Sequence, residues 1–260
     1  MKLSIIIPAY NEEKRIASRL DDLLSVFEKL RKSRKMDYEI IVVINKSTDK
    51  TENIAKKFRE KNKRILYMHL KEKGKGLAVM EGFKDVLKRK NDYIGFVDAD
   101  MATTAKEFAR LALKLIESKS DGIIASRYLP GAKVSPKPTL KRIIASRFYN
   151  YYIRLFFFFP YRDTQCGAKI FKREAIAKIT PHLINTKWAF DVDILFNLKK
   201  YGFKIIEEPT VWSDKSYSKV NLLYDGYRMG LSMLRLRILN SPFPEIMRFY
   251  DKLPKWMKLR

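Results

Sequence analysis

The sequence has little cysteine and little histidine, and this scarcity excludes several kinds of site. Cys166 is the single cysteine among 260 residues, so no disulfide within the chain and no cysteine zinc cluster can form. His69 and His182 are the two histidines, which makes a multi-histidine metal site a poor prospect. A metal site in this chain would depend on oxygen ligands.

Long apolar runs are also missing. The best candidate, residues 151–160, contains Arg154 and is about half of the roughly 20 residues that a helix needs to span a bilayer. Met1 leads directly into residues 3–8, which are too short for the core of a signal peptide and lack a small-residue cleavage site. We therefore expect no transmembrane helix, and a chain that lies on the cytoplasmic side of a membrane as a peripheral protein.

Acidic residues are outnumbered by basic ones. Lysine and arginine total 54 against 29 Asp and Glu, which gives a formal net charge of +25. Such an excess indicates an anionic partner or a solvated surface. Binding to nucleic acid is one interpretation of the charge, but no zinc finger, recognition helix or RNA-recognition motif supports it. We therefore expect no nucleic-acid partner.

The glycine-rich loops of common nucleotide-binding folds are absent. There is no G-x-G-x-x-G after the first expected strand and no G-x-x-x-x-G-K-[ST]. Residues 73–76 (Lys-Gly-Lys-Gly) open an expected helix instead. Their backbone amides could meet an anion there, or the segment could be a flexible loop.

What the first 130 residues do contain is an alternation of apolar runs with amphipathic patterns. The expected strands are 3–8, 39–44, 65–69, 93–97 and 122–126, and the expected helices are 13–32, 51–61, 77–90 and 106–118. This alternation predicts an α/β fold with a mostly parallel sheet and helices on both faces. In such sheets ligands bind beyond the carboxyl ends of the strands.

The remainder of the chain is more basic and less regular. Prolines between 130 and 138 mark a loop, and the later patterns predict helices at 140–158 and 190–201, strands at 169–171 and 204–211, and amphipathic helices at 219–239 and 245–252. We therefore expect an α/β domain over residues 1–212 that carries the site. Basic amphipathic helices over 213–260 would follow it and could lie on an anionic membrane surface.

Two carboxylates follow the fourth expected strand. Asp98 and Asp100 lie at its carboxyl end and are separated by one residue, Ala99. There they can converge on one divalent ion and the phosphates it binds. Mg²⁺ and Mn²⁺ prefer such oxygen ligands. A solvated turn is the alternative interpretation, but the preceding apolar strand and a helix cap at residues 103–104 favour a metal site.

Seven short motifs occur in order along the chain. They are 4–12 (SIIIPAYNE), 47–51 (STDKT), 74–76 (GKG), 98–100 (DAD), 126–128 (SRY), 163–167 (DTQCG) and 188–191 (WAFD). Together they resemble family 2 glycosyltransferases of the Rossmann-like GT-A fold, and among these the polyprenyl-phosphate hexose synthases. The resemblance covers about residues 1–240.

This resemblance implies a site for a nucleotide sugar. The residues that would bind the donor are Pro8, Ala9, Tyr10, Glu12, Asn45, Lys75, Asp98, Ala99 and Asp100. Asp98 and Asp100 would hold Mg²⁺ or Mn²⁺ against the diphosphate, whose departure a divalent cation assists as a Lewis acid.

The resemblance also implies a site for a lipid monophosphate. Arg127, Arg142, Ser146 and Lys219 would hold its phosphate group. Such a phosphate is largely a dianion at pH 7, so arginines that position it matter more than a general base. Asp191 and Asp193 occupy the position of an acidic residue that is often assigned as the base in related enzymes, and with Asp100 and Arg127 they complete the expected catalytic set.

The expected activity is transfer of a hexose to dolichyl or polyprenyl phosphate with inversion. Residues 44–46 (Ile-Asn-Lys) replace the two acids and the glycine that are usual in the second motif, so the nucleotide stays open between UDP-glucose and GDP-mannose, with glucose favoured. Met101 and Ala102 also depart from the family pattern. A glycan or a protein as the acceptor is the alternative.

Overall fold

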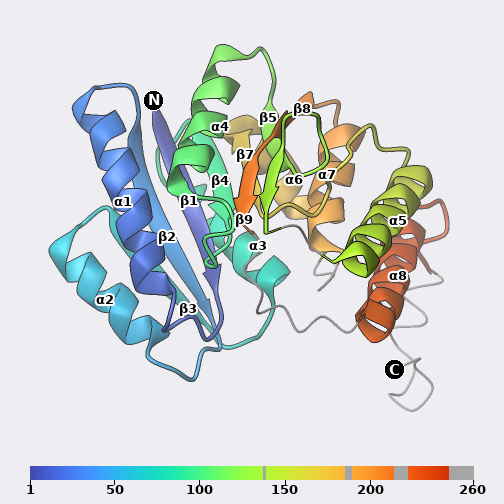
Figure 1. Ribbon diagram of the computed structural model, residues 1–260, viewed down its shortest axis with the longest axis horizontal. Coiled ribbons are helices and arrows are strands. Elements are labelled where there is room, and N and C mark those ends of the chain that lie inside the picture. The colour runs from blue at the N-terminus through green and yellow to red at the C-terminus, as the bar shows by residue number, and fades with distance from the viewer. Residues whose placement is uncertain (137–138, 185–188, 214–221, 246–260) are drawn as a thin grey trace.

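The computed structural model describes residues 1–136, 139–184, 189–213 and 222–245, with the backbone alone at 141, 142, 145 and 222–228. A seven-stranded sheet forms its centre (Figure 1). The strands are β1 (Lys2–Ala9), β2 (Asp37–Asn45), β3 (Ile65–Leu70), β4 (Tyr93–Val97), β5 (Gly122–Ser126), β6 (Lys133–Ser135), β7 (Ala168–Lys172), β8 (Ile205–Pro209) and β9 (Val211–Ser213). The helices are α1 (Ile16–Lys32), α2 (Thr51–Lys61), α3 (Lys75–Val86), α4 (Ala105–Glu117), α5 (Leu140–Phe157), α6 (Arg173–Ile179), α7 (Phe190–Lys200) and α8 (Leu222–Leu239), with a 3₁₀ turn at Thr180–His182.

The sheet order is β3-β2-β1-β4-β7-β5-β8. All neighbouring strands are parallel except at β7, which runs antiparallel between β4 and β5. β1 and β2 are buried along nearly their whole length because helices cover both of their faces. The expected mostly parallel α/β architecture is confirmed.

Each face of the sheet has its own hydrophobic core. Leu3, Ile5 and Ile7 of β1 point to the core that α1 and α4 complete, whereas Ile6 points to the core of α3, α6 and α7. This alternation is the two-residue period of a strand. The helices therefore hold β1 and its neighbours rigidly, and the ends of these strands become a fixed base for a site.

Three details differ from the sequence-based expectation. The strand expected at 204–211 divides at Thr210, whose backbone N–H donates to Ser126 O (3.1 Å). Beyond it, β9 leaves the main sheet and pairs with β6, in the segment expected to be only a loop. Helix α6 was not expected, and the expected helix at 245–252 lies outside the described residues except for residue 245.

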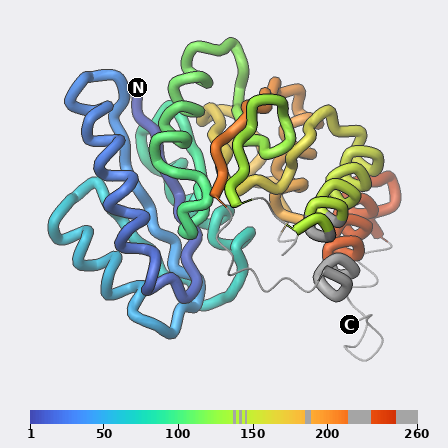
Figure 2. Tube along the Cα trace, viewed as in Figure 1, coloured from blue at the N-terminus to red at the C-terminus, as the bar shows by residue number. Residues whose placement is uncertain are grey.

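Helices α5 and α8 lie side by side at one end of the molecule (Figure 2). α8 buries Met233 and Leu236 in the same core as Ile153 and Phe157 of α5. The part of α8 that the structure describes therefore packs on the α/β domain. Within the described residues, no helix is both long enough and apolar enough to cross a bilayer.

Candidate active site

The carboxyl ends of β1, β2 and β4 surround a pocket with a volume of about 360 Å³. β1 pairs with β2 on one side and with β4 on the other, so the loops that follow these strands meet at one edge of the sheet. The structure brings together almost the whole expected donor set here, namely Pro8, Tyr10, Glu12, Asn45, Lys75, Asp98, Ala99 and Asp100. Ala9 is buried behind them and does not line the pocket.

Asn45 joins the segments that form the pocket. Its side-chain N–H donates to Ala9 O (2.9 Å), and its side-chain oxygen accepts from the backbone N–H of Gly74 (3.2 Å). Gly74 is the N-cap of α3, with a φ of 157°. Both polar groups of the Asn45 side chain are therefore hydrogen-bonded to the backbone. Through these two bonds Asn45 holds the start of α3 against the end of β1.

Lys75, in the first turn of α3, reaches the carboxylate pair. Its Nζ lies 2.6 Å from Oδ1 of Asp98. Burial alone would lower the pKa of Lys75, but the charges of Asp98 and Asp191 raise it above its usual value. The segment at 73–76 therefore brings a lysine ammonium to the pocket, in addition to the backbone groups of a helix start.

The acids of the pocket are crowded. Burial raises the pKa of Asp100, and the nearby charge of Asp98 adds to this shift. Burial also raises the pKa of Glu12, although Arg15 lies 2.6 Å from its Oε2 and opposes the shift. Raised carboxyl pKa values indicate negative charge that the protein compensates incompletely. A divalent cation with oxygen ligands fits this donor set.

Gly167 allows the close approach of Asp98 to the sheet. A Cβ added at Gly167 would lie 1.9 Å from Oδ2 of Asp98, which is far inside van der Waals contact. The backbone N–H of Asp98 also donates to Gly167 O (3.2 Å). The glycine of the 163–167 motif thus sets the position of the carboxylate at the end of β4.

Arg19 is a functional candidate that the sequence reasoning missed. It is fully buried on α1, and its Nη1 donates to Thr103 O (2.9 Å), just beyond the carboxylate pair. Burial lowers its pKa, whereas the charges of Asp22, Asp98 and Asp100 favour the cation. The sequence feature that could have identified Arg19 is its position on the apolar face of α1, three residues after Ile16.

Asp191 and Asp193 occupy different environments. Oδ1 of Asp191 lies 2.5 Å from Nζ of Lys169, which is fully buried and also donates to Cys166 O (2.6 Å). The charge of Asp191 also acts on Lys75, so Asp191 lies near the pocket, but its carboxylate is paired with Lys169. Lys169 was not expected at the site, although it lies within the antiparallel strand that follows Gly167.

Asp193 does not line the pocket. It is fully buried, and its two oxygens accept from the backbone N–H of Ile184 (2.6 Å) and from the side-chain amide of Asn197 (2.8 Å). Burial raises the pKa of Asp193 to about 7. These contacts tie the segment before α7 to the helix, and the expectation that Asp193 serves as an alternative base stays a prediction.

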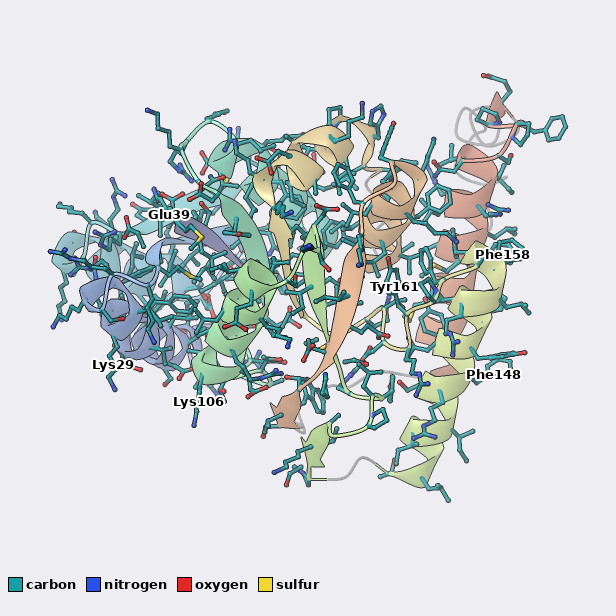
Figure 3. All side chains as sticks on the ribbon, turned by 90° about the horizontal axis from the view of Figure 1, so that it is seen from above. Lys29, Glu39, Lys106, Phe148, Phe158 and Tyr161 are labelled. Atoms are coloured by element: carbon teal, nitrogen blue, oxygen red, sulfur yellow. The ribbon has the colours of Figure 1, made fainter. Side chains whose placement is uncertain are left out.

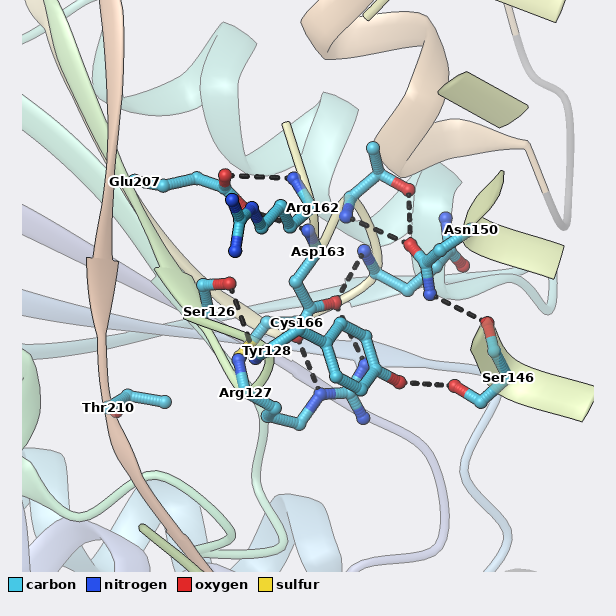
Figure 4. A network of polar contacts seen from close by, with 12 residues as sticks. Ser126, Arg127, Tyr128, Ser146, Asn150, Arg162, Asp163, Cys166, Glu207 and Thr210 are labelled. Carbon is cyan, nitrogen blue, oxygen red and sulfur yellow. Dashed lines mark hydrogen bonds and ion pairs between the residues drawn. The ribbon is translucent and has the colours of Figure 1, made fainter. Parts of the chain in front are cut away.

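Arg127 is held by a buried carboxylate (Figure 4). Its Nε and Nη2 lie 2.7 and 2.9 Å from the two oxygens of Asp163, which is fully buried. The guanidinium also lies over the rings of Tyr128 and Trp212, with centroids 5.4 and 5.2 Å away. Burial would raise the pKa of Asp163, but Arg127 lowers it below its usual value. Arg127 is thus fixed in orientation.

The other expected phosphate ligands are placed only in part. Ser146 of α5 is hydrogen-bonded to the hydroxyl of Tyr128, which follows Arg127 in the chain (Figure 4). This bond brings Ser146 and Arg127 to the same region. Arg142 lies on α5 but its side chain is outside the described residues, and Lys219 is outside them entirely.

Several proteins of similar sequence are named as glycosyltransferases. The chain is 34% identical over 243 residues to the dolichyl-phosphate β-glucosyltransferase of Dictyostelium discoideum, with 90% of this chain and 73% of that protein covered. It is 31% identical to the Saccharomyces cerevisiae protein of the same name, with 91% and 74% covered. It is 30% identical to glycosyltransferase AglD of Haloferax volcanii, with 90% of this chain but 37% of that protein covered.

Solved structures share the fold at low sequence identity. A mannosyltransferase from Pyrobaculum calidifontis in complex with GDP-Man and Mn²⁺ has a TM-score of 0.59 and 16% identity, covering 95% of this chain and 64% of the other. Glucosyl-3-phosphoglycerate synthase from Mycobacterium tuberculosis, with Mn²⁺ and UDP bound, has a TM-score of 0.63 and 16% identity, covering 91% and 78%. These likenesses confirm the expected GT-A fold.

Residues 4–180 match the family described as glycosyl transferase family 2. This segment contains the carboxylate pair, Lys75 and the Arg127–Asp163 pair, so the matched region includes the pocket described above. The chain therefore belongs to glycosyl transferase family 2.

Proposed function

We propose that the chain is an inverting hexosyltransferase that moves glucose from a nucleotide sugar to dolichyl or polyprenyl phosphate. The observation that carries the proposal is the pocket at the ends of β1, β2 and β4, which combines Asp98 and Asp100 with Lys75. The names of the relatives support glucose as the sugar and dolichyl phosphate as the acceptor. The cytoplasmic face of a membrane is the proposed location.

The nucleotide sugar lies in this pocket. Tyr10 is partly exposed at its rim, and Nζ of Lys73 lies 3.9 Å from the centre of its ring. Its aromatic face provides a surface for the base, and Lys73 and Lys75 provide positive charge for the diphosphate. UDP-glucose is the favoured donor and GDP-mannose the second choice.

Asp98 and Asp100 hold the divalent metal, Mg²⁺ or Mn²⁺. In the part of the chain that the structure describes, no group of three or more His, Cys, Asp and Glu could hold a metal ion by itself. Asp98 and Asp100 would supply carboxylate oxygens to the metal, and further oxygen ligands would come from the bound donor. When bound, the metal stabilises the negative charge that develops on the leaving group.

The acceptor is a lipid monophosphate that Arg127 positions. In the reaction, a phosphate oxygen forms a bond to the anomeric carbon while the bond from that carbon to the nucleoside diphosphate breaks, and the departing diphosphate keeps the electron pair. A phosphate monoester has a second pKa of about 6, so its reacting oxygen is already deprotonated at pH 7. A protein base is therefore unnecessary, which agrees with Asp191 being paired to Lys169.

A transfer assay tests the proposal. The full chain is incubated with radiolabelled UDP-glucose or GDP-mannose, Mg²⁺ or Mn²⁺, and dolichyl phosphate in detergent. We expect label in the lipid extract, with UDP-glucose giving more than GDP-mannose and a chelator abolishing transfer. Label on a glycan or a protein in the absence of lipid phosphate would support the alternative acceptor, and no transfer from either donor would contradict the proposal.

A further inference from the structure

Helix α5 presents an apolar stripe to solvent. Its members recur at intervals of three or four residues and are 60–72% exposed: Leu140, Ile144, Phe148, Tyr151, Leu155 and, at the C-cap, Phe158. That spacing places them on one side of the helix. Figure 3 shows Phe148 and Phe158 on the side of α5 that faces away from the sheet. We call these six residues the α5 stripe.

The opposite side of α5 is apolar too. Ile153 and Phe157 are buried against the domain, so the helix is already anchored without the stripe. The rest of the described surface has few exposed large apolar side chains, namely Met1, Tyr10, Val211, Leu234 and Phe243. A contiguous exposed apolar patch of this kind marks an interaction site.

Positive charge accompanies the stripe. Helix α5 carries four basic residues and no acidic ones. Beside it, Arg147, Arg154 and Arg162 line a cavity of about 260 Å³ together with Tyr128, Asn150 and Tyr151. Among the described residues, the buried Nε of Arg154 has no hydrogen-bond partner.

We propose that the α5 stripe docks on the surface of a lipid bilayer that contains anionic headgroups. Apolar side chains flanked by arginines on one helix have the chemistry of a helix that lies in the plane of the interface. A second copy of this chain fits poorly, because two α5 helices without acidic residues would repel each other across the contact. The docking rests on the proposed function, because it would bring Arg127 and Ser146 close to a membrane-bound acceptor.

Vesicle flotation tests the docking without the reaction. The full chain is mixed with phosphatidylcholine vesicles, with or without phosphatidylglycerol, in the absence of nucleotide sugar and polyprenyl phosphate. We expect binding to the anionic vesicles, and about a tenfold loss of binding in the double variant Phe148→Ser, Leu155→Ser. Val211→Ser, which removes an exposed apolar side chain of β9, should bind like the wild type.

A matched pair of charge-reversal variants tests how much the basic residues contribute to vesicle binding. Arg147→Glu should weaken binding to anionic vesicles about thirtyfold, because the reversal changes the charge by two units and each unit near such a surface contributes about a fivefold change. Lys29→Glu makes the same change of charge at the other end of the molecule (Figure 3) and should have little effect, because salt screens charges beyond about 8 Å. Equal effects of the two variants would contradict docking through α5.

Insertion can be observed directly at Phe148. The chain has three native tryptophans, so their emission, measured in the wild type, is subtracted from that of Phe148→Trp. The difference should show a blue shift and protection from a soluble quencher when anionic vesicles are added. Absence of both changes would overturn the proposal. A second result would also overturn the proposal. Sedimentation would show that the wild type is a dimer and that the double serine variant is a monomer, while the variant still binds vesicles like the wild type. Since none of these readouts involves sugar transfer, failure here is distinct from failure of the transfer assay.

Discussion

Two carboxylates one residue apart have separate partners in this structure. Asp98 is paired with Lys75 and packs on Gly167, whereas Asp100 accepts one hydrogen bond, from the backbone N–H of Ala102 (2.9 Å). Burial and the neighbouring charge raise the pKa of Asp100. Asp100 is therefore the member of the pair with most to gain from a divalent cation.

Asp100→Asn tests this assignment. The amide oxygen can still accept from Ala102, so we expect the fold to persist while kcat/KM for sugar transfer falls about a hundredfold, because metal-assisted departure of the diphosphate is weakened. Asp21→Asn, at an exposed position of α1, is the matched control and should leave kcat/KM unchanged. Unchanged kcat/KM in Asp100→Asn would contradict a metal at Asp100.

Asp193 gives a prediction about pH. Its pKa is about 7 in the folded protein and near 3.8 when unfolded, so the native state holds more protons between these values and stability falls as the pH rises through this window. Asp193→Asn lacks this titration. We expect it to melt at a similar temperature to the wild type near pH 4 and at a higher temperature at pH 8, with a difference in the free energy of unfolding of up to roughly 4 kcal/mol.

Thermal melting of both proteins across this pH range checks the prediction. Its physical basis is the buried contact of Asp193 with Ile184 N–H and Asn197. The single side-chain oxygen of an asparagine can accept only one of these two hydrogen bonds, and a protonated aspartate likewise places its O–H beside one of the two donors. A constant difference in melting temperature at all pH values would show that Asp193 is ionised throughout, and would reopen a role for it as a base.

Residue-level reasoning from the sequence reached the pocket but not its supports. The carboxylate pair and the loops at 8–12 and 74–76 were found because they follow apolar strands. Arg19 and Lys169 were missed because a buried cation is recognised by what surrounds it in space. Their partners, Thr103 O and Asp191, lie 84 and 22 residues away in the chain.

At the scale of elements, the first turn of α3 depends on close contact with α7. A Cβ added at Gly76 would lie 2.7 Å from Cβ of Phe190, the first residue of α7. This contact sets how far α3 can approach the sheet edge, and with it the position of Lys75. Few other residues could replace Gly76 without moving the lysine.

Gly76→Ala should therefore weaken donor binding. We expect about a tenfold rise in the Kd for the nucleotide sugar, and a loss of about 1–3 kcal/mol in the free energy of unfolding from overpacking. Gly230→Ala, at a helical position of α8 with open space around it, should leave the Kd unchanged and raise the free energy of unfolding by about 0.5–1 kcal/mol. Calorimetric titration with the donor measures the effect. An unchanged Kd in Gly76→Ala would show that the α3–α7 contact does not position Lys75.

Elements were predicted well where one periodicity persists along the sequence. The strands at 39–44 and 93–97 and the helix at 51–61 were recognised because their apolar faces are long and regular. The short partners β6 and β9 were not, since three-residue strands carry no periodic signal and form only through their mutual pairing. The antiparallel direction of β7 also depends on the path of the chain through α5.

At the scale of the whole molecule, the net charge of +25 affects stability. Like charges repel in the compact state, and salt screens that repulsion. We expect the melting temperature to rise by about 2–4 °C between low salt and physiological ionic strength. A fall instead would show that salt-sensitive ion pairs such as Lys75–Asp98 outweigh the net repulsion. Differential scanning fluorimetry across a salt series distinguishes these outcomes.

The central claim is that Asp98 and Asp100 bind a divalent metal against the diphosphate of a nucleotide sugar, in the pocket at the ends of β1, β2 and β4. A crystal structure of the full chain with Mn²⁺ and the donor selected by the transfer assay tests it most directly. The account predicts an anomalous manganese peak within coordination distance of an oxygen of each aspartate, with the diphosphate beside Lys75. A manganese peak and a diphosphate bound elsewhere, with both aspartates uncoordinated, would contradict it.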